Sequence, residues 1–157
     1  MPLADNKDTV KHIKDSLPAN TDIDKDVYGK KQYCDINEVI KSGDTTFINA
    51  DYIQFLTGQE AINAAISHHQ ADTFKTDDGK IQIGVPNDYY IVNDNKKIRR
   101  LQIDKNCVFH LELNPDRFHE IKDNSLESLT KIYKDSPFIL TLNDKNIVVE
   151  IKEVFLP

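Results

Sequence analysis

Residues 84–103, GVPNDYYIVNDNKKIRRLQI, constrain the fold more than any other stretch of this chain. A polar opening at Pro86 leads into two tyrosines and a short β-branched run, and a turn of Asn, Asp and Lys then leads back into alternating apolar residues. Aromatic and β-branched runs on both sides of such a turn are typical of a β-hairpin. We therefore predict a hairpin with a polar mouth here, packed at the centre of one compact sheet.

Similar runs fill much of the remaining chain. The predicted strands cover residues 27–36, 45–55, 107–113, 138–142 and 147–155, and a short hairpin is expected over residues 73–83 with its turn at 77–79. Thr57 stands three residues before Glu60, which is the spacing of a capping box, and opens the first predicted helix. Ser125 is the predicted cap of a second helix.

Strands outnumber helices in this pattern, and the sequence has neither a βαβ alternation nor a Gly-rich fingerprint. We therefore expect an α+β fold, built on a small, bent antiparallel β-sheet or a partly open barrel with two or three short helices. The length of 157 residues fits one domain with a real core. Residues 1–26 are polar and predict a short helix and a linker, and residues 27–157 predict a single β-rich α+β domain.

The chain is acidic, with 26 acidic against 20 basic residues and a formal net charge of −6. A nucleic-acid-binding protein normally shows a basic footprint. The basic residues at 96–97 and 99–100 are the nearest approach to one, and their position around a turn favours a solvated tip over a phosphate clamp. We therefore expect no nucleic-acid partner.

The sequence does not decide between a cytoplasmic and an exported location. No apolar run approaches the roughly 18 residues of a membrane-spanning helix, and Met1 opens into a polar stretch, so we expect neither a membrane span nor a signal peptide. A cytoplasmic protein fits this pattern, and so does an exported protein without its leader. Cys34 and Cys107 are too few for a disulfide framework, and two separate thiols are favoured over a pair.

Two segments resemble a family of small, uncharacterised bacterial domains. Residues 51–61 carry an Asp, an aromatic residue and then Gly-x-Glu-Ala, and residues 87–93 form an Asn-Asp-Tyr-Tyr-Ile-x-Asn run that is followed by Arg99. The closing residues 138–157 are similar to that family as well, so the resemblance covers residues 27–157. Members of the family are often exported proteins or lipoproteins of Gram-positive bacteria. The resemblance therefore implies a self-contained domain and an envelope location, without a mechanism.

The chain departs from the family pattern at two positions. Phe55 stands where Trp is common, and Gln102 stands where Pro is more usual. Because a proline in an edge strand blocks further strand pairing, its replacement puts the protection of that edge in doubt.

Polar and aromatic residues of the two segments form the candidate ligand-binding site. They are Asp51, Asn87, Asp88, Tyr89, Tyr90, Asn93 and Arg99. One interpretation is a pocket at the hairpin mouth, in which Arg99 binds a carboxylate or a phosphate with both ends of its guanidinium. The favoured interpretation is structural: the Asn and Asp residues end strands through side-chain turns, and Arg99 pairs with Asp88 or Asp51.

Three further residues are of the types that bind metals: His110, Glu112 and His119. Catalytic zinc takes three protein ligands in a tetrahedral frame, and nothing in this spacing specifies such a frame. For this reason a metal-dependent hydrolase that uses these residues is only our second hypothesis, after a non-catalytic binding domain. The sequence has no Gly-x-Ser-x-Gly elbow, and neither cysteine has neighbours that would obviously activate a thiol.

We predict a non-catalytic binding or protein-interaction domain without a cofactor, at the cell envelope if the resemblance holds. Its partner would be a protein or a small-molecule ligand. A third hypothesis is a purely structural or assembly module in which exposed strand edges pair with a partner. The sequence leaves the oligomeric state open.

Overall fold

The computed structural model describes residues 29–112 and 123–156, and this part contains nine strands, two α-helices and one 3₁₀ turn. The elements in chain order are β1 Lys30–Ser42, β2 Thr45–Tyr52, β3 Gln54–Thr57, α2 Gly58–Ser67, β4 Asp72–Lys75, β5 Ile81–Gly84, the 3₁₀ turn Pro86–Asp88, β6 Tyr89–Val92, β7 Ile98–His110, α3 Leu126–Ile132, β8 Phe138–Leu142 and β9 Val148–Glu153. The helix predicted within residues 1–26 lies outside the described residues.

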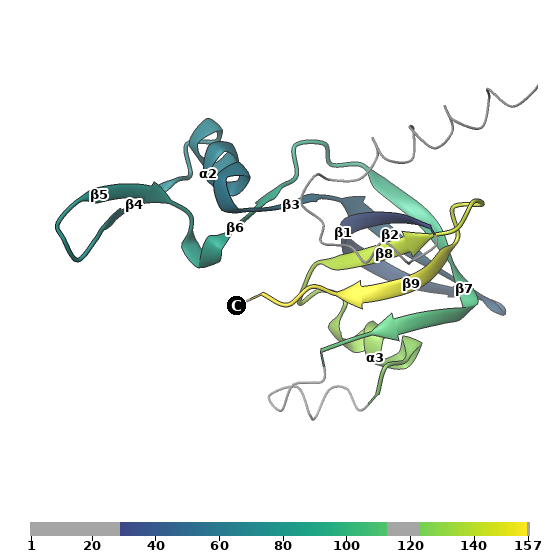
Figure 1. The fold of residues 1–157 in the computed structure, drawn as a ribbon. Helices are drawn as coiled ribbons and strands as arrows, with labels where there is room; N and C mark the ends of the chain where they lie inside the picture. Colours follow the sequence, from purple (N-terminus) through teal and green to yellow (C-terminus); the bar gives the residue numbers. More distant parts are fainter. Residues whose placement is uncertain (1–28, 113–122, 157) are drawn as a thin grey trace, which may run out of the picture.

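Five strands form a closed ring in the order β1-β2-β7-β9-β8, in which β8 pairs back onto β1 (Figure 1). All neighbouring strands are antiparallel except β7 and β9, which are parallel. The predicted α+β class with a majority of strands is confirmed. The closure and the parallel pair were not predicted. A parallel neighbour requires a long crossover, and here the chain from β7 to β9, which includes α3 and β8, supplies it.

The ring and α3 share one hydrophobic core. Leu129 and Ile132 of α3 are fully buried in it. Ser125 caps α3 as predicted, because its hydroxyl accepts a hydrogen bond from the backbone N–H of Ser128 at 3.2 Å. The remaining buried members come from all five strands of the ring and the end of β7: Cys34, Ile36, Ile48, Ala50, Leu101, Ile103, Leu111, Phe138, Leu140, Leu142, Val148 and Ile151.

Residues 54–92 extend away from the ring and form what we call the arm (Figure 1). At the base of the arm β3 pairs antiparallel with β6, whereas β2 and β7 pair inside the ring. Residues 45–57 and 89–103 thus form one long ribbon that is interrupted between Asp51 and Gln54, where residues 93–97 bulge out. We call residues 93–97 the junction segment.

The predicted hairpin over residues 84–103 is therefore wrong. Its two runs are strands, but β6 pairs with β3 and β7 pairs with β2 and β9. Alternation of apolar residues identifies a strand and does not name its partner. The central position that we assigned to this hairpin belongs instead to the five-stranded ring, and the side chains of β6 are only half-buried.

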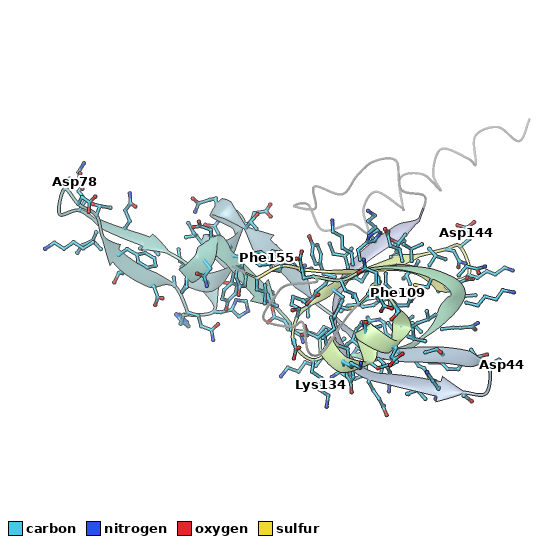
Figure 2. All side chains as sticks on the ribbon, turned by 90° about the horizontal axis from the view of Figure 1, so that it is seen from below. Asp44, Asp78, Phe109, Lys134, Asp144 and Phe155 are labelled. Carbon is cyan, nitrogen blue, oxygen red and sulfur yellow. The ribbon has the colours of Figure 1, made fainter. Side chains whose placement is uncertain are left out.

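Helix α2 packs on the base of the arm, and the β4–β5 hairpin forms its tip (Figures 1 and 2). Ala61 and Ala65 of α2 are fully buried together with Val85. The capping box predicted at Thr57 is not formed, because Gly58 has φ +58° at the first helical position and the Thr57 side chain makes no capping hydrogen bond. The turn predicted at residues 77–79 is confirmed.

Candidate interaction site

The structure divides the predicted ligand-binding residues between two places. Those at the base of the arm are Asp51, Asn93 and Arg99, and those farther along it are Asn87, Asp88, Tyr89 and Tyr90. Asn87 and Asp88 are separated from the first group by the length of β6, whereas Tyr89 and Tyr90 lie in the half of β6 that is farther from the ring. The single pocket at a hairpin mouth is therefore not formed.

Asp51 fixes the junction segment to the ring. Its side chain is only 6% exposed, and its carboxylate accepts a hydrogen bond from Asn93 Nδ2 at 2.9 Å and another from the backbone N–H of Lys97 at 3.1 Å. These two donors lie at opposite ends of the junction segment. Carboxylates that accept such bonds order the backbone they hold, so the role of Asp51 here is architectural.

Arg99 does not pair with Asp51 or Asp88 in the described part of the chain. Its Nη1 donates a hydrogen bond to the carbonyl of Lys97 at 2.9 Å, and its guanidinium lies over the ring of Tyr52 at 4.1 Å from the centroid. The structural interpretation had assigned Asp88 or Asp51 as the partner of Arg99, and these contacts replace that ion pair. Arg99 also stabilises the junction segment, but through a carbonyl and an aromatic face.

A second carboxylate stands directly opposite Asp51. Asp35 of β1 is its cross-strand partner, and the pKa of Asp35 is raised, first by burial and second by the charge of Asp51. Like charges opposite each other destabilise a pair of strands. The neighbouring thiol of Cys34 is fully buried, and burial followed by the charges of Asp35 and Asp51 raises its pKa well above the ordinary value.

Cavities near these residues offer little room for a ligand. The one at the junction measures about 280 Å³ and lies between Tyr52, Gln32 and the start of the junction segment. Pockets that bind drug-sized ligands typically measure roughly 300–1,000 Å³ and are well enclosed. A larger cavity of about 510 Å³ lies between β2, β7 and α3, and none of the predicted site residues lines it.

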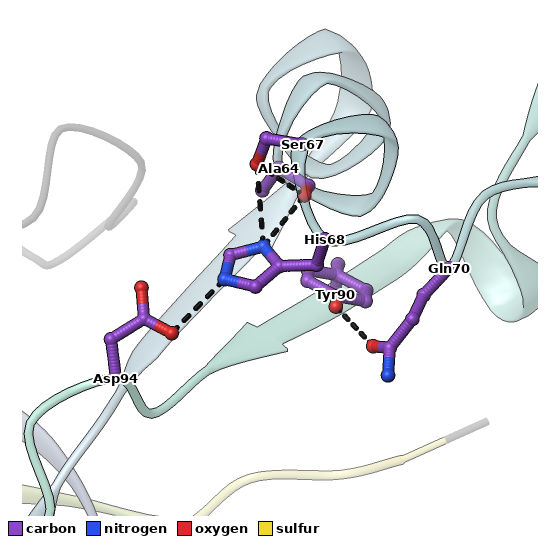
Figure 3. A network of polar contacts seen from close by, with 6 residues as sticks. All are labelled: Ala64, Ser67, His68, Gln70, Tyr90 and Asp94. Atoms are coloured by element: carbon purple, nitrogen blue, oxygen red, sulfur yellow. Dashed lines mark hydrogen bonds and ion pairs between the residues drawn. The ribbon is translucent and has the colours of Figure 1, made fainter.

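The two tyrosines serve the packing of the arm. The ring of Tyr89 stacks on Phe55 with 5.1 Å between centroids, and Phe55 stacks on Tyr33 of β1 with 5.5 Å. This aromatic ladder joins the arm to the ring. The hydroxyl of Tyr90 donates a hydrogen bond to Gln70 just beyond α2 (Figure 3).

Asn87 and Asp88 have φ values of +57° and +60°, in the left-handed region that Asn and Asp tolerate better than most residues. They turn the chain from Val85 into β6. The structural interpretation has them end strands through side-chain turns, whereas here they form the turn that precedes β6.

A Ser-His-Asp group lies at the end of α2 (Figure 3). His68 Nε2 is 3.0 Å from Asp94 Oδ1, and His68 Nδ1 is 3.3 Å from Ser67 Oγ. The geometry resembles a catalytic triad, but Nδ1 is also 2.8 Å from the carbonyl of Ala64, which only accepts hydrogen bonds, so Nδ1 carries a proton. His68 therefore has no free lone pair with which to activate Ser67, and the hydroxyl itself donates to Ala64 at 2.7 Å.

The predicted metal ligands do not converge among the described residues. His110 Nε2 lies 3.0 Å from Glu150 Oε1, and Glu112 is held through its backbone N–H, which donates to Glu153 at 2.8 Å. His119 lies outside the described residues. Within residues 29–112 and 123–156, no group of three or more His, Cys, Asp or Glu side chains is placed to hold a metal ion.

The most unusual surface of the described chain is the β4–β5 hairpin at the tip of the arm. Every residue of β4 is exposed, Ile81 is 76% exposed and Ile83 is 54% exposed. Phe74 on the opposite face covers Gly84, where an added Cβ would lie 2.9 Å from its ring. Exposed apolar groups that are gathered on one element, rather than scattered singly, mark interaction surfaces.

The sequence pattern had suggested nothing special about this hairpin. The sequence predicted a short hairpin over residues 73–83 and no exposure of its apolar side chains, because β-branched and aromatic residues are typical of strands whether or not they are covered. Residues 81–87 carry no charge, but the sequence has longer uncharged runs at residues 52–59 and 61–71, so this feature alone does not single out the hairpin.

Comparison with protein-family models, with curated proteins and with solved structures gives no match. The resemblance to bacterial envelope domains therefore stays a prediction. In the described ranges, no helix is both long and apolar enough to cross a membrane.

Proposed function

We propose that this protein is a non-catalytic interaction domain whose arm contacts a protein partner. The observation that carries this proposal is the β4–β5 hairpin, which presents exposed isoleucines and two unpaired strand edges at the far end of the arm. Figure 2 has Asp78 at that end, and Asp44 and Asp144 at the turns on the opposite side of the ring. The five strands of the ring close on one another, whereas the β4–β5 hairpin pairs with no other strand of the described residues, so we assign strand pairing with a partner to the arm.

The chemistry of the described residues supports binding over catalysis. Both nitrogens of the His68 imidazole already have hydrogen-bonding partners. The Asp51 carboxylate holds the junction segment and faces the Asp35 carboxylate across the strands. The Cys34 thiol is buried and the Cys107 thiol is half-buried. An envelope location forms part of the proposal, and only the resemblance supports it.

The mode of binding that fits a free strand edge is strand addition. In this mode an extended segment of the partner pairs with the edge, the backbone supplies hydrogen bonds, and alternate side chains supply specificity. The outer edge of β5 would provide Ile81 and Ile83 as those specificity positions.

A peptide selection tests this function directly. A library of displayed random peptides is selected against the wild-type protein, and the enriched peptides are then assayed on the double variant Ile81→Lys/Ile83→Lys. The control is Val108→Lys. Val108 is 51% exposed, an exposed fraction similar to that of Ile83, but it lies on β7 in the ring and not on the arm. We expect extended peptides with alternating apolar residues that bind the wild type and the control and lose binding to the double variant.

Two results would contradict the proposed function. One is a selection that enriches no peptide family at all. The other is a set of peptides that bind the double variant as well as the wild type, which would move the binding surface away from the arm.

A further inference from the structure

The hydrogen-bonding groups of β5 that face solvent can be assigned from the ladder. The backbone N–H of Thr76 donates to the carbonyl of Lys80 at 2.8 Å, so these two residues form a hydrogen-bonded pair at the turn. In an antiparallel ladder hydrogen-bonded and non-hydrogen-bonded pairs alternate. Gln82 therefore bonds back to β4, whereas the N–H and C=O groups of Ile81 and Ile83 point away from it.

The two edges of the hairpin differ in the number of charged side chains that would oppose pairing with another strand. Charged side chains on an edge strand discourage pairing with another chain. The β4 edge carries Asp72 and Lys75, but residues 81–87 on the β5 side carry no charge. Lys80 precedes this run, and its ammonium already lies 3.0 Å from Asp78 in the same turn. The β5 edge is thus the open one.

The sequence of this edge is self-complementary. Ile81, Gln82 and Ile83 read the same in both directions, so an antiparallel copy related by a twofold axis at Gln82 sets each isoleucine opposite the other. We propose that β5 pairs with the β5 strand of a second copy of this chain in this register. The inference rests on the proposed function of the arm and names its partner.

Only this register uses both solvent-facing residues of β5. Ile81 would exchange backbone hydrogen bonds with Ile83 of the second copy, and Ile83 with Ile81, because both residues present their N–H and C=O groups outward. A twofold axis at Ile83 would require Val85, which is 6% exposed and packed in the α2 cluster. An axis at Ile81 would set Ile83 opposite Gly79 in the turn.

The paired strands would also bury the isoleucines. Ile81 and Ile83 lie on one face of β5, and in the four-stranded sheet formed by two arms the four isoleucine side chains become neighbours on that face. No like charges meet, because Lys80 falls opposite Gly84 of the second copy. Two short strands make a small interface, so we expect a weak, concentration-dependent dimer.

Sedimentation velocity of the full chain tests the association. We expect wild-type protein and Val108→Lys to shift from monomer to dimer as the concentration rises through the micromolar range, and Ile81→Lys/Ile83→Lys to stay monomeric throughout. Circular dichroism of each variant checks that the ring is still folded. A wild-type protein that stays monomeric to millimolar concentration, or a double variant that dimerises like the wild type, would overturn the proposal.

A cross-link tests the register without disturbing the isoleucines. Opposed Gln82 residues form a non-hydrogen-bonded pair, whose Cα atoms lie about 4.5 Å apart and within the range that a disulfide spans. Gln82→Cys should therefore form a disulfide-linked dimer under mild oxidation. Thr73→Cys on β4 and the wild type, with its two native thiols, should not. Equal cross-linking of Thr73→Cys, or none of Gln82→Cys, would contradict the register.

The two proposals can fail separately. If the wild type stays monomeric while selected peptides still require Ile81 and Ile83, self-pairing is wrong and the interaction function stands. If peptide binding also ignores these residues, both proposals are wrong.

Discussion

His68 ties the end of α2 to the junction segment. Its Nδ1 lies 2.8 Å from the Ala64 carbonyl and its Nε2 lies 3.0 Å from Asp94, so the imidazole serves both partners best with a proton on each nitrogen. The carbonyl of Ala64 and then the carboxylate of Asp94 raise the pKa of His68. Because the pKa is raised on folding, the contact contributes its full stability at a pH below the ordinary pKa of histidine. This contribution is lost as the pH rises through the higher pKa of His68 in the folded protein.

Replacing Asp94 tests this contact. We expect Asp94→Asn to lower the pKa of His68 toward its ordinary value, because the carboxylate that favours the imidazolium is gone. Titration of the imidazole protons by NMR measures the shift. Ser67→Ala is the control and should leave the pKa where it is, since Nδ1 donates to Ala64. An unchanged pKa in Asp94→Asn would contradict the assigned partner.

The two cysteines should be poor nucleophiles in the folded protein. Burial, followed by the charges of Asp104 and Glu150, raises the pKa of Cys107 to about 12, and burial raises the pKa of Cys34 well above its ordinary value. The thiolate is the reactive species, so a disulfide reagent at about pH 8 should label native protein slowly and label both thiols quickly once guanidinium unfolds it. Rapid labelling of native Cys107 would contradict this environment.

The facing carboxylates of Asp35 and Asp51 make stability depend on pH. Because the pKa of Asp35 is higher in the folded protein than in the unfolded chain, the folded protein holds this proton more tightly. The stability contribution of Asp35 therefore falls as the pH rises from its ordinary pKa through the raised one.

Asp51→Asn tests this pair and the junction together. Loss of the facing charge should bring the pKa of Asp35 down, as measured by carboxyl NMR titration. The variant should also lose about 1–3 kcal/mol in urea unfolding, because the charge of the acceptor is lost and one of the two part-buried hydrogen bonds, from Asn93 Nδ2 or from the Lys97 N–H, loses its acceptor oxygen. Asp144→Asn, at the exposed β8–β9 turn, is the matched control and should change neither quantity. A variant as stable as the wild type would remove Asp51 from its architectural role.

Individual elements were more predictable than their pairing. Local patterns located most strands, the cap at Ser125 and the turn at residues 77–79, because each depends on neighbours in the chain. The pairing of β3 with β6 depends on the bend at Ile53, which is buried and donates its N–H to Tyr33 at 3.1 Å. No local pattern encodes that bend, so the hairpin over residues 84–103 was predicted in place of an interrupted ribbon.

The candidate site was predictable in its residues and not in its arrangement. Asp51, Asn93 and Arg99 do gather, because the ribbon sets residues 49–52 beside residues 97–100. Asn87 and Asp88 lie beyond β6, a separation that follows only from the true pairing. The exposed tip escaped prediction for a different reason, since exposure of an apolar strand depends on what the rest of the fold leaves uncovered.

At the scale of the whole molecule, the ring should fold without the arm. The hydrophobic core of the ring draws no residue from the arm, and β2 and β7 remain paired up to Asp51 and Ile98. We expect a chain that lacks residues 54–92, with Ile53 joined to Asn93 through a short Gly-Ser linker, to unfold cooperatively by heat with a strand-rich circular dichroism spectrum. It should no longer bind selected peptides. Failure to fold would show that the arm is part of the core structure.

Amide hydrogen exchange by NMR tests most directly whether the outer edge of β5 is the surface at which this protein pairs with a partner. The protein is followed in a concentration series and again with a selected peptide. We expect exchange at the Ile81 and Ile83 amides to slow when a second copy of the chain binds at high concentration and when the peptide binds. The exchange rate of the Gln82 amide, which is already hydrogen-bonded to β4, should change far less. Unchanged exchange at Ile81 and Ile83 in both experiments, or new protection confined to the ring, would contradict pairing at this edge.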